Sequence, residues 1–276
     1  TIFDFNREPV EVLHEILLKR GFLVELRDGQ LRLSDNAMLL PVKRGNRHYH
    51  GPVESDAEFL APLLEKRFMA RMDSDYVIHC LGTDYARAAE FLFRFKQTGG
   101  EAGYEHRIES WRYFSREHAF KVPVAVLEPF VALLVKGFSA AGVMTYSCCD
   151  GHGIYPAHVA FVEGYNLVWA ETVIDVVHKN LHHGLFTEIK KDTLFMDAFS
   201  PVRNMHEPAV SGIPDSFYKG MLNAGAFIYR NRFILRDIKR ELVETADIGQ
   251  RNDSEQFREH IARGKAKGIF SREWII

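Results

Sequence analysis

The sequence predicts an α+β protein, with a mixed sheet flanked by helices and a small helix-hairpin module at the N-terminus. Segments that place apolar residues at helical spacing recur along the 276 residues, and short apolar or alternating runs typical of strands lie between them. Around residue 150 the expected order is helix, strand, loop, strand, helix, and this order favours a mixed sheet.

The N-terminal module is expected to contain one helix and one hairpin. Residues 8–20 place apolar side chains at helical spacing, and Gly21 follows where a helix would end. Residues 22–33 contain two short strand-like runs joined by Asp28-Gly29, a dipeptide typical of tight hairpin turns. Over residues 8–40 the order helix, glycine, hairpin and Leu-x-Leu resembles TubC-type N-terminal docking modules. That resemblance implies contact with another chain or segment.

A second helix is expected over residues 56–72, where the apolar residues share one face. We therefore expect a division into two parts. Residues 1–75 would form the small α/β module with its linker helix, and residues 76–276 would form the main α+β domain.

The overall composition restricts the class of protein. A hydrophobic content of 46% with 26% charged residues is typical of soluble globular proteins. The formal net charge of −2 argues neither for nor against a polyanionic partner. Because the sequence lacks a run of about 18 apolar residues, no membrane association is expected. Three cysteines, two of them adjacent, make a poor disulfide framework, so we expect a reducing, cytoplasmic location.

Residues 142–153 are the most informative stretch, and they read Gly-Val-Met-Thr-Tyr-Ser-Cys-Cys-Asp-Gly-His-Gly. One strand is expected over residues 143–146 and another over residues 158–162. Two thiols, a carboxylate and an imidazole therefore fall between Cys148 and His152, in a loop that follows a buried strand. Function often concentrates in loops of this kind.

The residues of this loop suit nucleophilic or acid–base chemistry. Cys149 is the expected nucleophile or metal ligand, and His152 is its expected base, co-ligand or phosphate contact. Asp150 would orient His152 or a metal-bound water, and Ser147 would contact the substrate. The alternative is structural, with the two cysteines as small buried residues and His152 bonded to a carbonyl of the turn.

A metal site is a further alternative, because thiolate and imidazole groups are the ligands that zinc prefers. The expected ligands are Cys148, Cys149, His152 and His158. The spacing lacks a Cys-x-x-Cys pair, so the metal hypothesis depends on residues that are remote from one another in the sequence.

The same stretch resembles the Ser-Cys-x-Gly-Arg loop region of the wybutosine-synthesis tRNA methyltransferases, over residues 122–181. Thr145, Cys149 and Gly151 take the places of that motif's Thr, Cys and Gly, and His152 stands where the motif has Arg. The resemblance implies a transferase that uses S-adenosylmethionine and acts on a modified guanosine in tRNA.

A basic stretch could hold phosphate groups. Arg230, Arg232 and Arg236 are interleaved with aromatic residues within and just after an expected strand over residues 226–235. The alternative is a solvated strand face followed by an ordinary helix.

Two functions follow from these observations. The first is an enzyme that acts on a nucleotide or nucleic acid and uses the Cys-Cys-Asp-Gly-His loop as a reactive or metal-binding site. The second is a non-catalytic binding or regulatory protein, in which this loop is structural and the N-terminal module docks a partner. The sequence does not predict an oligomeric state.

Overall fold

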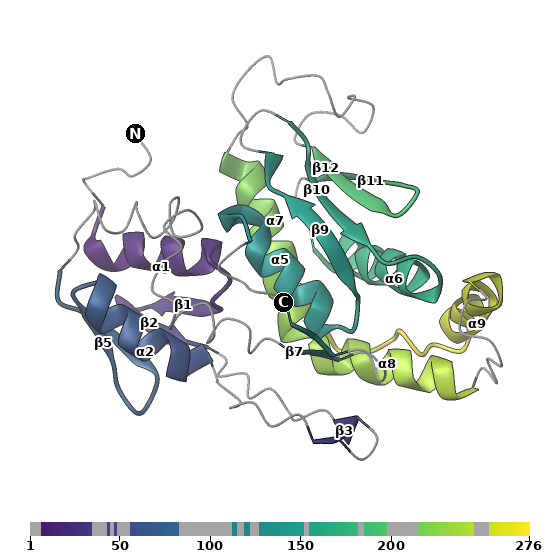
Figure 1. The fold of residues 1–276 in the computed structure, drawn as a ribbon, viewed down its shortest axis with the longest axis horizontal. Helices are drawn as coiled ribbons and strands as arrows, with labels where there is room; N and C mark the ends of the chain where they lie inside the picture. The colour runs from purple at the N-terminus through teal and green to yellow at the C-terminus, as the bar shows by residue number, and fades with distance from the viewer. Residues whose placement is uncertain are drawn as a thin grey trace. The chain divides into compact units, whose positions relative to one another are not determined.

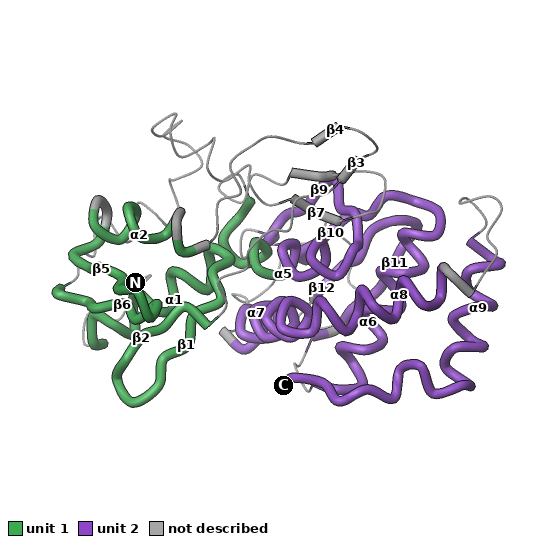
Figure 2. Tube along the Cα trace, turned by 90° about the horizontal axis from the view of Figure 1, so that it is seen from below, with its two compact units in different colours: residues 1–133 green, residues 134–276 purple. Residues whose placement is uncertain are grey.

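A computed structural model describes most of the chain. The described residues are 7–34, 43–44, 47–48, 56–82, 112–114, 119–121, 127–151, 155–181, 185–197, 215–245 and 254–276. The predicted site residue His152 lies outside these ranges. The chain forms two compact units, residues 1–133 (unit 1) and residues 134–276 (unit 2), which Figure 2 draws in different colours.

Unit 1 begins with the predicted helix and hairpin. Helix α1 (Pro9–Lys19) has a proline in its first turn, where the missing N–H costs nothing. Strands β1 (Val24–Arg27) and β2 (Gln30–Leu33) pair antiparallel across a turn in which Asp28 and Gly29 both have positive φ. The helix and the hairpin are therefore confirmed (Figure 1).

A second hairpin completes the sheet of unit 1. Helix α2 (Asp56–Arg67) is followed by strands β5 (Ala70–Met72) and β6 (Val77–Cys80), and the strand order is β1-β2-β6-β5. The helix predicted to residue 72 is thus too long, because residues 70–72 pair with β6 and bury Ala70. The domain boundary expected after residue 75 falls inside this β5–β6 hairpin.

Two short strand pairs lie elsewhere in residues 1–133. Strand β3 (Lys43–Arg44) pairs with β4 (Arg47–His48), and β7 (Arg112–Phe114) pairs with β8 (Ala119–Lys121). Both pairs are antiparallel.

The second four-stranded sheet belongs to unit 2, and helix α5 leads into it across the boundary between the units. Its elements, in chain order, are α5 (Pro129–Ala140), β9 (Thr145–Cys149), β10 (Ala157–Phe161), α6 (Tyr165–Asn180), β11 (Phe186–Lys190) and β12 (Thr193–Asp197). The strand order is β11-β12-β10-β9, with every pair antiparallel. The α+β class is confirmed, and the described sheets are antiparallel where a mixed sheet was expected.

One face of the unit 2 sheet packs against helices. Phe161 of β10 meets Phe138 of α5 edge-to-face, with ring centroids 5.1 Å apart. Val159, Leu194 and Met196 are buried on the same side, because strand residues two apart share a face and the register aligns their strands. This alternation leaves the intervening residues of each strand on the opposite face.

The C-terminal part of the described chain is helical. Helix α7 (Asp215–Arg230) meets α8 (Arg232–Thr245) at the buried Asn231, and α9 (Ser254–Ala266) follows. The strand predicted over residues 226–235 is therefore wrong. Its apolar residues lie on the buried sides of two consecutive helices. A short apolar run alone does not distinguish a buried strand from the buried side of a helix. None of the described helices is long and apolar enough to cross a membrane.

Candidate functional site

Both neighbouring thiols lie inside a strand and not in the loop that follows it. Strand β9 runs to Cys149, three residues beyond the predicted end of the strand at residue 146. The longer strand results from pairing with β10, which places Cys148 opposite Val159 and Cys149 opposite His158. The three cysteines, Cys80, Cys148 and Cys149, are half-buried, and none of them forms a disulfide.

The two thiols project to opposite faces of the sheet. Successive strand residues alternate between faces, and Cys148 is paired with Val159, which is fully buried on the helix-covered side. Cys149 therefore shares the other face with His158. One metal ion cannot take both thiolates while the strand stays regular, which weakens the four-ligand zinc hypothesis.

A row of side chains crosses all four strands on the face that bears Cys149. The register places Cys149 opposite His158, His158 opposite Phe195, and Phe195 opposite Glu188. The rings of His158 and Phe195 have centroids 6.0 Å apart. The row thus brings together a thiol, an imidazole, an aromatic ring and a carboxylate, and each is half-exposed.

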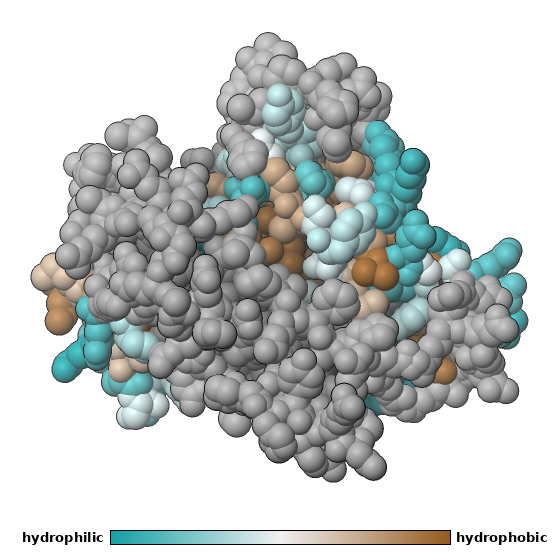
Figure 3. All heavy atoms as spheres, viewed as in Figure 1, coloured by the Kyte–Doolittle hydropathy of each residue, from teal (hydrophilic) through white to brown (hydrophobic). Residues whose placement is uncertain are grey.

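A second row lies beside the first on the same face. It runs from the exposed Ser147 past Ala160 and Thr193 to the exposed Lys190, whose ammonium is 3.0 Å from the carboxylate of Glu188. In the space-filling view, apolar side chains lie beside polar ones over the region where Figure 1 draws β9, β10 and β12 (Figure 3).

The end of β9 is held in a defined geometry. The backbone N–H of Gly151 donates a hydrogen bond to the Cys149 sulfur at 3.3 Å. Gly151 has φ of 78°, a left-handed conformation that suits glycine. Asp150 is buried at 6% exposure, which fits a positioning role better than direct contact with a substrate.

The start of β9 is fixed by a buried amide. The Asn166 side chain accepts a hydrogen bond from the N–H of Met144 at 2.7 Å and donates to the carbonyls of Met144 and Val162 at 3.0 and 2.7 Å. One residue of α6 thereby joins the chain just before β9 to the chain just after β10. This arrangement supports the register on which the Cys149–His158 pair depends.

The metal hypothesis has partial support in geometry. Cys149 and His158 provide a thiol and an imidazole on one face, both of which suit zinc. The Cys149 sulfur and a carboxylate oxygen of Asp150 lie within 4.8 Å of each other, so a thiol and a carboxylate of unit 2 are close enough to share one ion. Further ligands would have to come from elsewhere, and the expectation of zinc or S-adenosylmethionine stays a prediction.

The three predicted phosphate-binding arginines lie at the junction of α7 and α8. The Arg232 guanidinium is buried between the rings of Tyr229 and Phe233, at 4.4 and 4.3 Å from their centroids, and donates to the Tyr229 carbonyl. Burial lowers the pKa of Arg236. Arg230 ends α7, one residue before Asn231. Arg232 is thus a packing residue in this structure.

Lys239 of α8 is a notable group that the sequence argument missed. Its ammonium donates a hydrogen bond to the Gly142 carbonyl at 2.5 Å and lies 5.2 Å from the Tyr165 ring centroid. Burial, with a smaller contribution from Arg236, lowers its pKa to about 7. In the sequence, Lys239 lies four residues after Leu235 and three before Leu242. This spacing places it on the apolar side of a helix, which could have indicated a buried lysine.

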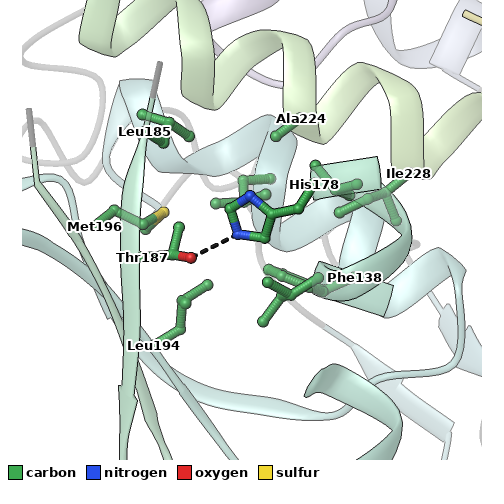
Figure 4. Close-up of a pocket in the computed structure, with 11 residues that line it drawn as sticks. Phe138, His178, Leu185, Thr187, Leu194, Met196, Ala224 and Ile228 are labelled. Carbon is green, nitrogen blue, oxygen red and sulfur yellow. Dashed lines mark hydrogen bonds between the residues drawn. The ribbon is translucent and has the colours of Figure 1, made fainter. Parts of the chain in front are cut away.

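A small apolar cavity lies between the sheet and helices α5, α6 and α7. His178 and Thr187 stand at its edge, with Nε2 and Oγ1 2.6 Å apart (Figure 4). Burial lowers the pKa of His178. The cavity has room for about 20 Å³, enough for one water molecule, so it does not suit a larger ligand in this conformation.

Comparison of the chain with protein-family models, with curated proteins and with solved structures finds no match.

Proposed function

We propose that unit 2 is the core of an enzyme that acts on a nucleotide or nucleic acid through a thiol–imidazole pair formed by Cys149 and His158. The observation that supports this most directly is their register, since each lies opposite the other on neighbouring antiparallel strands. Side chains in such positions have Cβ atoms about 4.5–5.5 Å apart, within reach of a proton transfer.

Groups with opposite effects on a thiolate lie near the Cys149 sulfur, because the Gly151 N–H favours negative charge there and an Asp150 carboxylate oxygen within 4.8 Å opposes it. His158 would accept the thiol proton, and the resulting thiolate is the nucleophilic form of cysteine. The Gly151 N–H, which points at the sulfur, stabilises negative charge there. The thiolate would form a bond to an electron-poor ring carbon of the substrate, and the displaced π electrons would take the proton that His158 returns.

The neighbouring ring favours a flat substrate. Phe195 lies next to His158 on the same face, and a half-exposed aromatic ring suits stacking with a nucleobase. The ammonium of Lys190 lies on that face as well, paired with Glu188 at 3.0 Å, and a phosphate would have to displace that carboxylate to bind it. A base against Phe195 would therefore bring its ring atoms close to the Cys149–His158 pair.

Thiol reactivity tests the first half of the proposal. The rate of alkylation by iodoacetamide would be measured against pH, with the modified residue identified by mass spectrometry, for the wild type, Cys149→Ser, Cys148→Ser and His158→Gln. We expect Cys149 to react about tenfold faster than Cys148 at pH 7 and His158→Gln to remove that difference. Equal rates at both cysteines would contradict an activating Cys149–His158 pair. They would favour the alternative in which these residues have a structural role only.

Ligand binding tests the second half. Binding of AMP, GMP, CMP and UMP would be measured by calorimetry for the wild type and for Phe195→Ala. We expect one or more of them to bind and the substitution to weaken that binding about tenfold, because a stacked base contributes roughly 1–3 kcal/mol. Phe233→Ala, an exposed ring on α8, is the control that should leave binding unchanged. Binding that persists in Phe195→Ala would contradict a substrate on this face.

A further inference from the structure

The sheet of unit 1 has one polar, exposed face. Leu31, Leu33 and Ile78 are buried on one side, whereas Arg32 and His79, which alternate with them, are exposed on the other. The exposed face therefore consists of the strand residues that do not contribute to the core.

A row of nitrogen-bearing side chains crosses this face. Arg27 pairs with Gln30, and Arg71 pairs with His79. Since Leu31 lies opposite Ile78, the preceding Gln30 falls beside His79 in the antiparallel register. The row thus runs over all four strands, and at a strand spacing of about 4.8 Å it is about 14 Å long.

Two of the arginines on this face lie outside its ion pairs among the described residues. Arg27 is 2.7 Å from Glu25, and His79 is 2.7 Å from Asp73. Arg32 and Arg71 are exposed and form no ion pair with any described residue. Glu25 lies opposite Arg32 in the register and offsets part of its charge, whereas Arg71 lies opposite His79.

We infer that this face of unit 1 binds the sugar-phosphate backbone of a single-stranded nucleic acid. Guanidinium groups on one face suit a chain of phosphates, because each bonds a phosphate through two N–H groups, and here Arg71 stands in the row while Arg32 stands in the row beside it. The face has no aromatic side chain among its described strand residues, so we expect little discrimination between bases. The inference depends on unit 1 alone and does not require the Cys149–His158 pair.

Fluorescence anisotropy with a labelled 20-nucleotide oligouridylate tests this inference on the full chain. The double variant Arg32→Gln/Arg71→Gln should bind about tenfold more weakly at 100 mM NaCl. The slope of log affinity against log salt should become shallower by about 1.4, because each lost phosphate contact on a single strand contributes about 0.7. An unchanged affinity and slope would overturn the inference.

A matched control separates this face from overall charge. Arg263→Gln/Lys267→Gln removes the same charge from exposed positions of α9 and the turn after it. We expect this control to bind the oligonucleotide like the wild type, and an equal loss in both variants would refute a specific face. Thermal unfolding of each variant should match the wild type, because Arg32 and Arg71 are exposed.

Two further measurements distinguish the alternatives. Polyglutamate of the same total charge should compete poorly with the labelled oligouridylate for the wild-type protein. Competition as strong as that of unlabelled oligouridylate would indicate an acidic protein, and not a nucleic acid, as the partner. Arg32→Gln/Arg71→Gln should leave the rate of Cys149 alkylation at its wild-type value. A failure of the thiol chemistry and a failure of this interface would therefore be seen in different variants.

Discussion

The ammonium of Lys239 donates a hydrogen bond to the carbonyl oxygen of Gly142, 2.5 Å away and 97 residues earlier in the chain. Gly142 follows helix α5, where backbone carbonyls carry partial negative charge. The rings of Tyr165 and Trp169 lie 5.2 and 6.0 Å from the same ammonium. The contact joins α8 to the end of α5 in a largely apolar setting.

This contact predicts a specific pH dependence of stability. The pKa of Lys239 is lowered from 10.5 to about 7 in the folded protein, so the unfolded chain binds more protons between these values. The free energy of unfolding should therefore increase as the pH rises from 7, by about 2 kcal/mol at pH 9. Urea denaturation at several pH values measures this gain, and Lys239→Met should abolish it. An identical pH profile in both proteins would contradict the lowered pKa.

Asn166→Ala should destabilise unit 2 by about 2–4 kcal/mol, because it removes three hydrogen bonds from backbone groups near the ends of β9 and β10. Chemical denaturation measures the loss. Asn180→Ala is the control, since that side chain donates one hydrogen bond, to Val176, from a less buried position. Its cost should stay below about 1 kcal/mol. Equal costs for the two variants would disprove a special role of Asn166.

Gly151→Ala should cost about 2–3 kcal/mol, more than glycine's conformational freedom alone explains. A Cβ at this position would lie 3.1 Å from the backbone nitrogen of Ala157 and 3.2 Å from the carbonyl carbon of Pro156. The matched control is Gly29→Ala. Gly29 has a similar φ of 74° and no atom within 4 Å of a Cβ, so about 1 kcal/mol is expected. The difference between the two thermal unfolding free energies measures the crowding, and a difference near zero would contradict it.

Local patterns were sufficient to predict part of this fold. The apolar spacing of α1 and the Asp28-Gly29 turn specify their conformations through neighbouring residues, and both are confirmed. The apolar run over residues 226–235 does not specify its own conformation, because its burial depends on helices and strands that are remote in sequence. The strand predicted there is instead the end of α7 and the start of α8.

The candidate site shows the same limit. Cys149 was singled out by its neighbours in the sequence, with His152, three residues later, as its expected base, whereas His158 was expected only as a metal ligand. The structure places His158 opposite it, nine residues later, and Phe195 one strand further. The pairing register that brings them together is set by the packing of a whole sheet, so the sequence around Cys149 does not contain it.

The opposite orientation of Cys148 and Cys149 has a consequence for oxidation. Adjacent α-carbons are 3.8 Å apart, less than the usual separation of about 4.4–6.8 Å in a disulfide. Joining the two sulfurs would also require β9 to leave its pairing with β10. Under oxidising conditions the two half-buried thiols should therefore respond independently, each forming a mixed disulfide from its own face of the sheet.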